Sequence, residues 1–255
     1  MPKMSYRLPK VPPVVHHKPV PYAGPKRTII RKRRPRTAYG MRERIESIQN
    51  IGQGRNLIIV ASGPSVRDIN FEGLDNTYDA LYVNRPYSPL GHIAKYWAVN
   101  DQPIVNQHLR HMQKFPGQMI CGASSFVRGR DIIKIKVLAG AGFSLDLVRG
   151  FHLGRSTTLS SLQAAFWMDY DHIYIVGLDM TTAEYHDKSD NPNVSPTARI
   201  ERFKNEATYW RRATEILIEQ NLIHKVTMVT NCNPFPFVQE YEIENNLKDP
   251  AWRSH

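Results

Sequence analysis

The chain has 255 residues, 41% of them hydrophobic, which is enough for one large domain with a sizeable core, alone or preceded by an arm. Its net charge of +11 is unevenly distributed, because residues 1–45 carry +12 and residues 46–255 carry −1. Two cysteines, Cys121 and Cys232, provide neither a disulfide framework nor a CxxC metal motif, and no apolar run reaches the roughly 18 residues of a transmembrane helix. We therefore expect a protein of a reducing, cytoplasmic compartment with no secretory signal and no transmembrane segment.

The first segment, residues 1–45, is a basic arm that holds eight of the 18 prolines. Proline lacks an N–H and fixes φ, so the arm should be extended and, in isolation, disordered up to about Tyr39. The stretch "RTIIRKRRPR" is dense enough in charge to bind nucleic acid, an acidic membrane or an acidic protein face, although a solvated tail is the simpler alternative. The polyanion-binding candidates are Arg31, Lys32, Arg33, Arg34 and Arg36.

Residues 46–255 alternate between short apolar runs and amphipathic runs, which predicts a single Rossmann-like α/β domain with a C-terminal tail. Strand–helix alternation favours a mainly parallel sheet with helices on both faces. Helical spacing is clear over residues 155–170 and 197–221. The glycine-punctuated segment 137–154 is typical of a small hairpin insertion. Strands are expected at residues 56–62, 79–85, 95–101, 118–124, 131–138, 172–179 and 225–231.

The first strand runs directly into "ASGPS" and then into an amphipathic stretch. Gly63 permits close approach of the backbone or a positive φ, and Pro64 suits the first position of a helix. Ser62 and Ser65 offer hydroxyls beside a helix N-terminus, which is an anion-binding arrangement. A plain strand–helix turn explains the same residues equally well. The pattern is neither GxGxxG nor GxxxxGK[ST], so a standard dinucleotide site or P-loop is disfavoured.

Two further strands also end in polar residues. "LYVNRPY" ends its apolar run at Asn84, and "KYWAVND" ends at Asn100 and Asp101. An asparagine amide both donates and accepts hydrogen bonds, which suits the edge of a base or a ribose, although each asparagine alone is usually a turn residue. Because ligands bind outside the carboxyl ends of parallel strands, we expect these residues to help form a nucleotide site.

The stretch "IIVASGPSVRDINFEGLDNTYDALYVNRPY", followed later by "GRSTTLSSLQAAFWMDYDHIYIVGLDM", resembles the family 42 bacterial sialyltransferases. It is equally similar to a broader family that includes archaeal 6-hydroxymethylpterin diphosphokinase and bacterial and phage proteins. The likeness covers roughly half of the chain. It implies that Gly63, Pro64, Ser65, Asn84 and Asn100 hold the nucleotide of a sugar donor. The family usually has asparagine where this chain has Ser62, which leaves the donor nucleotide open.

A second group of candidates lies in the later half of the chain. Arg155, Ser156 and Thr157 begin a helix and offer a cation and hydroxyls to a phosphate or an acceptor, although a capped helix start with a surface arginine is an equal alternative. Asp179 ends a strand, and His186 follows it in a polar loop. A histidine is the usual base for removing a hydroxyl proton, so both are candidate catalytic residues, with an exposed loop histidine as the simpler alternative.

Three functions follow. The first is a nucleotide-dependent transferase, glycosyltransferase-like, that uses a nucleotide-sugar donor. The second is a Mg²⁺-dependent diphosphotransferase that uses ATP, with Asp101, Asp179 or Asp187 near the metal. The third is a non-catalytic phage protein that docks on nucleic acid or a large assembly through residues 1–45, in the host cytoplasm or the virion. No metal site of the protein's own is expected, because His108 and His111 lack an evident third ligand.

Overall fold

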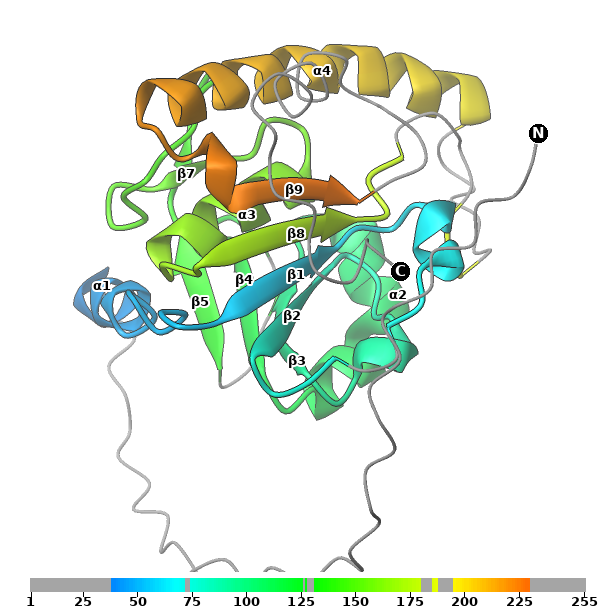
Figure 1. Ribbon diagram of the computed structural model, residues 1–255, viewed down its shortest axis with the longest axis horizontal. Helices are drawn as coiled ribbons and strands as arrows, with labels where there is room; N and C mark the ends of the chain where they lie inside the picture. The colour runs from blue at the N-terminus through cyan, green and yellow to red at the C-terminus, as the bar shows by residue number, and fades with distance from the viewer. Residues whose placement is uncertain are drawn as a thin grey trace, which may run out of the picture.

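The computed structural model describes residues 38–71, 74–125, 127, 131–179, 185–187 and 195–229. These residues form a seven-stranded, all-parallel sheet with four α-helices, so the α/β prediction is confirmed (Figure 1). The polyanion-binding candidates between residues 31 and 36 and the expected C-terminal tail beyond residue 229 lie outside the described residues. Within the part of the chain that the structure describes, none of the helices combines the length and hydropathy that a bilayer-spanning helix needs.

All seven expected strands are present in the sheet, in the order β5-β4-β3-β2-β1-β8-β9. Each consists of four to six largely buried residues, as expected for a parallel sheet with both faces covered. The strands are Asn56–Val60 (β1), Tyr78–Val83 (β2), Ala94–Ala98 (β3), Gln118–Gly122 (β4), Ile132–Ile135 (β5), His172–Val176 (β8) and Val226–Val229 (β9).

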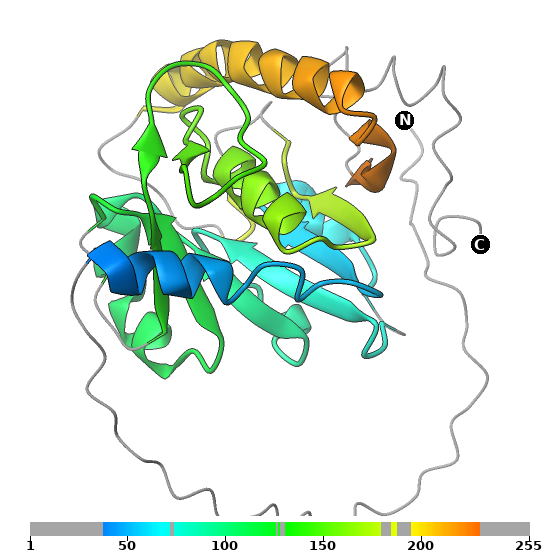
Figure 2. The same cartoon turned by 90° about the vertical axis from the view of Figure 1, so that its left-hand side faces the viewer.

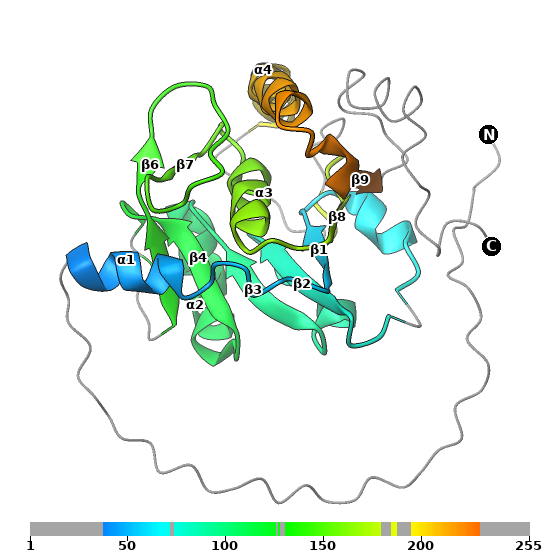
Figure 3. The same ribbon diagram turned by 60° about the vertical axis from the view of Figure 1, so that its left-hand side comes forward.

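The alternation of side chains along β1 sends Leu57 and Ile59 to one face of the sheet and Ile58 and Val60 to the other. Helices α1, α3 and α4 cover the first face, while α2 covers the second (Figures 2 and 3). The second face is completed by two short 3₁₀ helices, Pro64–Asp68 (η1) and Ser88–Leu90 (η2). The α-helices are Ala38–Glu46 (α1), Gln102–Lys114 (α2), Thr157–Trp167 (α3) and Pro196–Glu219 (α4).

Two local features concern the ends of the expected arm and the expected hairpin. The expected boundary between arm and body, at residues 45/46, falls inside α1, because the Ile45 side chain is buried in the core and its carbonyl accepts a hydrogen bond from Trp167 Nε1 at 2.8 Å. The expected hairpin between residues 137 and 154 was wrong: Val137–Leu138 (β6) and Phe151–His152 (β7) pair in parallel. The intervening loop therefore crosses over rather than turning back on itself.

The strand order places a topological switch point between β1 and β8. From β1 the chain builds the sheet outward through β2 to β5, and β8 then pairs with the opposite edge of β1. Connections leave the two sides of β1 in opposite directions, which opens a crevice at the carboxyl ends of these strands. This crevice is where the polar strand ends meet.

Candidate functional site

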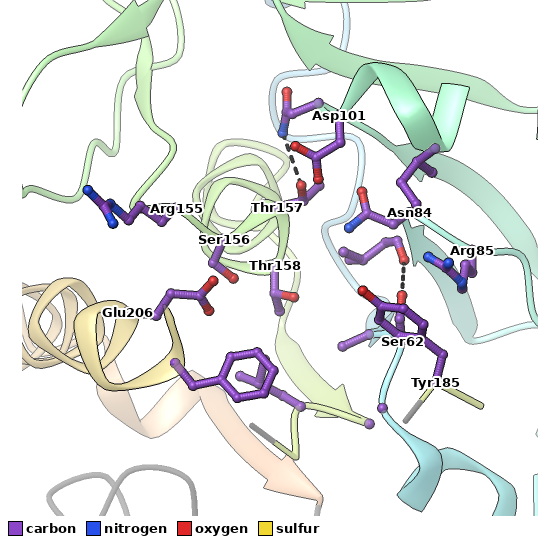
Figure 4. A pocket seen from close by; sticks show the side chains of 18 of the residues that line it. Ser62, Asn84, Arg85, Asp101, Arg155, Ser156, Thr157, Thr158, Tyr185 and Glu206 are labelled. Atoms are coloured by element: carbon purple, nitrogen blue, oxygen red, sulfur yellow. Dashed lines mark hydrogen bonds between the residues drawn. The ribbon is translucent and has the colours of Figure 1, made fainter. Parts of the chain in front are cut away.

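A cleft of about 360 Å³ lies at the carboxyl ends of β1, β2, β3 and β8, beneath the start of α3 and the first half of α4 (Figure 4). We call it the switch-point cleft. Its volume lies in the range of small-ligand sites. Among the predicted site residues, it is lined by Ser62, Gly63, Asn84, Asn100, Asp101, Arg155, Ser156, Thr157 and Asp179.

The loop after β1 is held in place by hydrogen bonds to neighbouring strands and loops. Asp179 is buried, and its carboxylate accepts hydrogen bonds from the Ser65 backbone N–H at 2.8 Å and from the Ser65 hydroxyl. Ser62 Oγ donates to the Val83 carbonyl at 2.9 Å, which ties the end of β1 to β2. Asp179 is thus occupied in positioning η1, so it fixes the shape of this wall of the cleft.

Asn84 presents its side chain to the cleft from the end of β2. Its backbone has φ of +64°, in the left-handed region, and is held by hydrogen bonds to Ala98 and Trp97. Its buried Oδ1 has no hydrogen-bond partner among the described residues. Residues in sparsely populated backbone regions cluster at functional sites, and an unsatisfied buried acceptor requires an explanation. A ligand in the cleft that turns this amide would supply the missing donor.

Asn100, at the end of β3, is engaged differently. Its Oδ1 accepts a hydrogen bond from the Gly122 N–H at 2.7 Å, and its Nδ2 donates to Ser160 Oγ at 3.3 Å and Thr157 Oγ1 at 3.5 Å. The amide therefore links β3 and β4 to α3. The neighbouring Asp101 is exposed at the N-terminus of α2 and lines the cleft. Asn100 positions the start of α3, whereas Asp101 faces the cleft with its charge.

The N-terminus of α3 forms the opposite wall. Thr157 and Thr158 begin the helix and are buried, while Ser156 precedes them with no side-chain cap bond. The first N–H groups of a helix lack intrahelical partners and attract anions. Arg155 lies immediately before them, exposed, with φ of +58°. A helix N-terminus and a cation beside it form an arrangement that suits a phosphate.

Glu206 enters the cleft from α4, although the sequence analysis did not select it. The residue is only 3% exposed, and its carboxylate pairs with Arg202 Nε at 3.3 Å. Burial raises its pKa to about 7, with Arg202 and Arg155 opposing the rise and Asp101 adding to it. The sequence did contain a sign of this site. Glu206 lies on the same helical face as Phe203 and Trp210, and a charged residue is unusual on the apolar face of an amphipathic helix.

Arg85 is a second cleft residue that was not selected. It is 1% exposed, directly follows Asn84, and pairs through Nε with Asp187 at 3.1 Å. Its guanidinium also lies 3.9 Å from the centre of the Tyr185 ring. These contacts hold residues 185–187 against the mouth of the cleft. The sequence could have suggested Arg85 as a site residue, because it directly follows the asparagine that ends a predicted strand in "VNRPY".

The structure places three predicted site residues behind the walls of the switch-point cleft: Pro64, Ser65 and His186 do not line it. His186 is buried, packs edge-on against Tyr87 with ring centres 5.3 Å apart, and donates its backbone N–H to the Ser62 carbonyl at 3.0 Å. Burial lowers its pKa, with Asp187 opposing this shift and Arg85 adding to it. In this arrangement His186 supports the loop that carries Ser62.

No protein-family model, no curated protein and no solved structure matches this chain. The functional assignment therefore depends on the chemistry of the switch-point cleft, together with the motifs that line it.

Proposed function

We propose that the chain is a nucleotide-dependent transferase, glycosyltransferase-like, that binds a nucleotide-sugar donor in the switch-point cleft of a Rossmann-like sheet. The observation that carries the proposal is the convergence of the unsatisfied Asn84 amide and the α3 N-terminus, with Arg155, on one cleft. The amide suits a base or ribose, and the helix N-terminus suits the phosphates. A nucleotide is a good leaving group, so the protein needs only to orient the reactants and stabilise the charge that develops during transfer.

The Mg²⁺-dependent diphosphotransferase is the second candidate, favoured by the presence of Asp101 and Glu206 in the same cleft. Magnesium is commonly held by one or two carboxylates together with substrate phosphates. Over the described ranges, no group of three or more His, Cys, Asp or Glu residues is arranged to hold a metal. Docking through the cationic arm rests on its charge of +12 alone.

The test is a thermal-shift screen of the full chain with CMP, UMP, ADP, ATP, GDP and nucleotide-sugars, each with and without Mg²⁺. A ligand that binds only the native state raises the melting temperature by mass action. We expect a saturable shift with one nucleotide or its sugar conjugate. Independence from Mg²⁺ supports the glycosyltransferase-like function, and a requirement for Mg²⁺ with ATP supports the diphosphotransferase. The absence of any shift across the panel contradicts both.

The matched variants are Asn84→Gly and Asn50→Gly. Both asparagines have a positive φ that glycine adopts without strain, but Asn50 is exposed and does not line the cleft. Loss of the amide contacts at Asn84 should weaken nucleotide binding by about tenfold, corresponding to roughly one hydrogen bond. Asn50→Gly should bind as the wild type does. Equal binding by all three proteins would place the nucleotide elsewhere.

A further inference from the structure

The switch-point cleft holds three carboxylates in different environments. Asp179 accepts hydrogen bonds from Ser65, and Asp101 is exposed at the start of α2. Glu206 is buried, and within the described part of the chain it forms an ion pair with Arg202, one turn earlier on α4.

A purely structural role explains Glu206 poorly. The side chains of Trp210, Ala213 and Leu217 continue the same face of α4 into the core. Burying a carboxylate beside them costs free energy, and an ion pair with the half-exposed Arg202 offsets this cost incompletely. An apolar residue would stabilise the helix better. Strongly perturbed carboxyl groups in clefts are candidates for catalytic acids and bases.

The Glu206 carboxylate lies close to the N-terminus of α3. Figure 4 shows its carboxylate pointing toward Ser156 and Thr158, beside the helix N-terminus that suits a phosphate. The charged groups that face it are Arg202 on α4, Arg155 before α3 and Asp101 before α2. A hydroxyl group that approaches the phosphate side of a bound donor would pass next to this carboxylate.

We infer that Glu206, rather than His186, is the general base of the cleft and takes the proton from the acceptor hydroxyl. This inference rests on the proposed transferase function. In the step, the acceptor O–H bond breaks and its proton passes to the Glu206 carboxylate. The oxygen lone pair forms a bond to the anomeric carbon of the donor sugar, while the bond from that carbon to the phosphate oxygen breaks. The nucleotide leaves with that electron pair, and the proton on Glu206 then passes to solvent.

The ionisation of Glu206 suits this task. A general base is most effective when its pKa lies near the working pH, and burial has brought this carboxyl to about 7. Arg202 and Arg155 keep the deprotonated form accessible at neutral pH, whereas Asp101 makes the carboxylate more basic. The rate of transfer should therefore rise with pH and level off once Glu206 is ionised.

The experiment compares the full wild-type chain with Glu206→Gln and Glu206→Asp, using CMP-, UDP- and GDP-sugars with water or a soluble glycoside as acceptor. Nucleotide release is measured between pH 5.5 and pH 9. We expect Glu206→Gln to bind nucleotide normally but to release it at least about 100-fold more slowly, without the rising limb of the pH profile. Glu206→Asp, which keeps the carboxylate, should recover part of the rate. Glu215→Gln, at an exposed site on the same helix, is the control.

The outcomes separate the inference from the proposed function. Wild-type rate and pH profile in Glu206→Gln would overturn the inference while leaving the transferase in place. If the wild type binds nucleotide but no sugar donor reacts, the inference is tested by calorimetry at pH 7.5. Titrations in two buffers of different ionisation enthalpy measure how many protons the protein takes up when nucleotide binds. Binding should then take up about half a proton if the phosphate raises the pKa of Glu206 by one unit. Uptake that persists in Glu206→Gln overturns the inference. Failure of every nucleotide to bind overturns the proposed function itself.

Discussion

Gly63 lies where the surrounding loops leave no room for a side chain, a constraint that the neighbouring sequence does not reveal. Its φ is −75°, so the position does not need the left-handed conformation that glycine permits. A Cβ atom here would lie 2.5 Å from both Asp179 Oδ2 and the Gly177 carbonyl oxygen. Glycine is therefore required for the close approach of the loops after β1 and β8. The two loops meet at the switch point, so this contact shapes the cleft.

Gly63→Ala should destabilise the fold by about 1 to 3 kcal/mol, because the added methyl group overpacks a contact with backbone and a buried carboxylate. Urea denaturation of both proteins measures the change in the free energy of unfolding. Gly91→Ala is the control, since its φ is −59° and its nearest atom lies at 3.2 Å. Equal stability of Gly63→Ala and the wild type would show that the two loops separate freely.

At the scale of elements, a single glutamine holds the segment 136–152 to α3. Gln163 is fully buried, and its Oε1 accepts hydrogen bonds from the Ser144 and His152 N–H groups, both at 2.9 Å. Its Nε2 donates to the His152 carbonyl at 2.7 Å and to the Leu159 carbonyl at 3.1 Å. Strands β6 and β7 have two residues each, too few to hold this segment by themselves. Side-chain hydrogen bonds therefore replace a longer ladder.

Gln163→Leu should lower the free energy of unfolding by about 3 kcal/mol or more, because two N–H groups and two carbonyls lose their hydrogen bonds to this side chain. Amide hydrogen exchange should accelerate most at Ser144 and His152, the two donors to Gln163. Gln113→Leu, on the exposed side of α2, provides the comparison. Unchanged exchange at both donor amides would contradict this role.

For the whole molecule, the buried Glu206 makes stability depend on pH. Its pKa is about 7 in the folded protein and near 4.5 when exposed, so the native state binds more protons than the unfolded state between these values. Stability from this group is therefore lost as pH rises from about 4.5 to 7. The pKa values of His108, His172 and His186 are lowered by burial. These histidines therefore have the opposite effect, and their contribution to stability is lost as the pH falls below 6.5.

Between pH 5 and pH 8 the wild type should lose about 2 to 3 kcal/mol of stability relative to Glu206→Gln, because the variant lacks the titrating carboxyl. Chemical denaturation of both proteins at the two pH values measures this difference. The histidines are common to both proteins and cancel in the comparison. A constant difference across the range would mean that Glu206 titrates normally in the folded state.

The sequence alone determined the seven strands, the parallel α/β class and the polar ends of β1, β2 and β3, because buried parallel strands are continuous apolar runs and their ends lie at one edge. It did not determine the parallel pairing of β6 with β7 or the location of His186 behind the cleft. The first depends on the hydrogen bonds of Gln163 on α3, and the second on the contacts that residues 185–187 make with the loops after β1 and β2, which are distant in sequence. Glu206 lies 105 residues from Asp101 in the chain, and only the tertiary structure places both in one cleft.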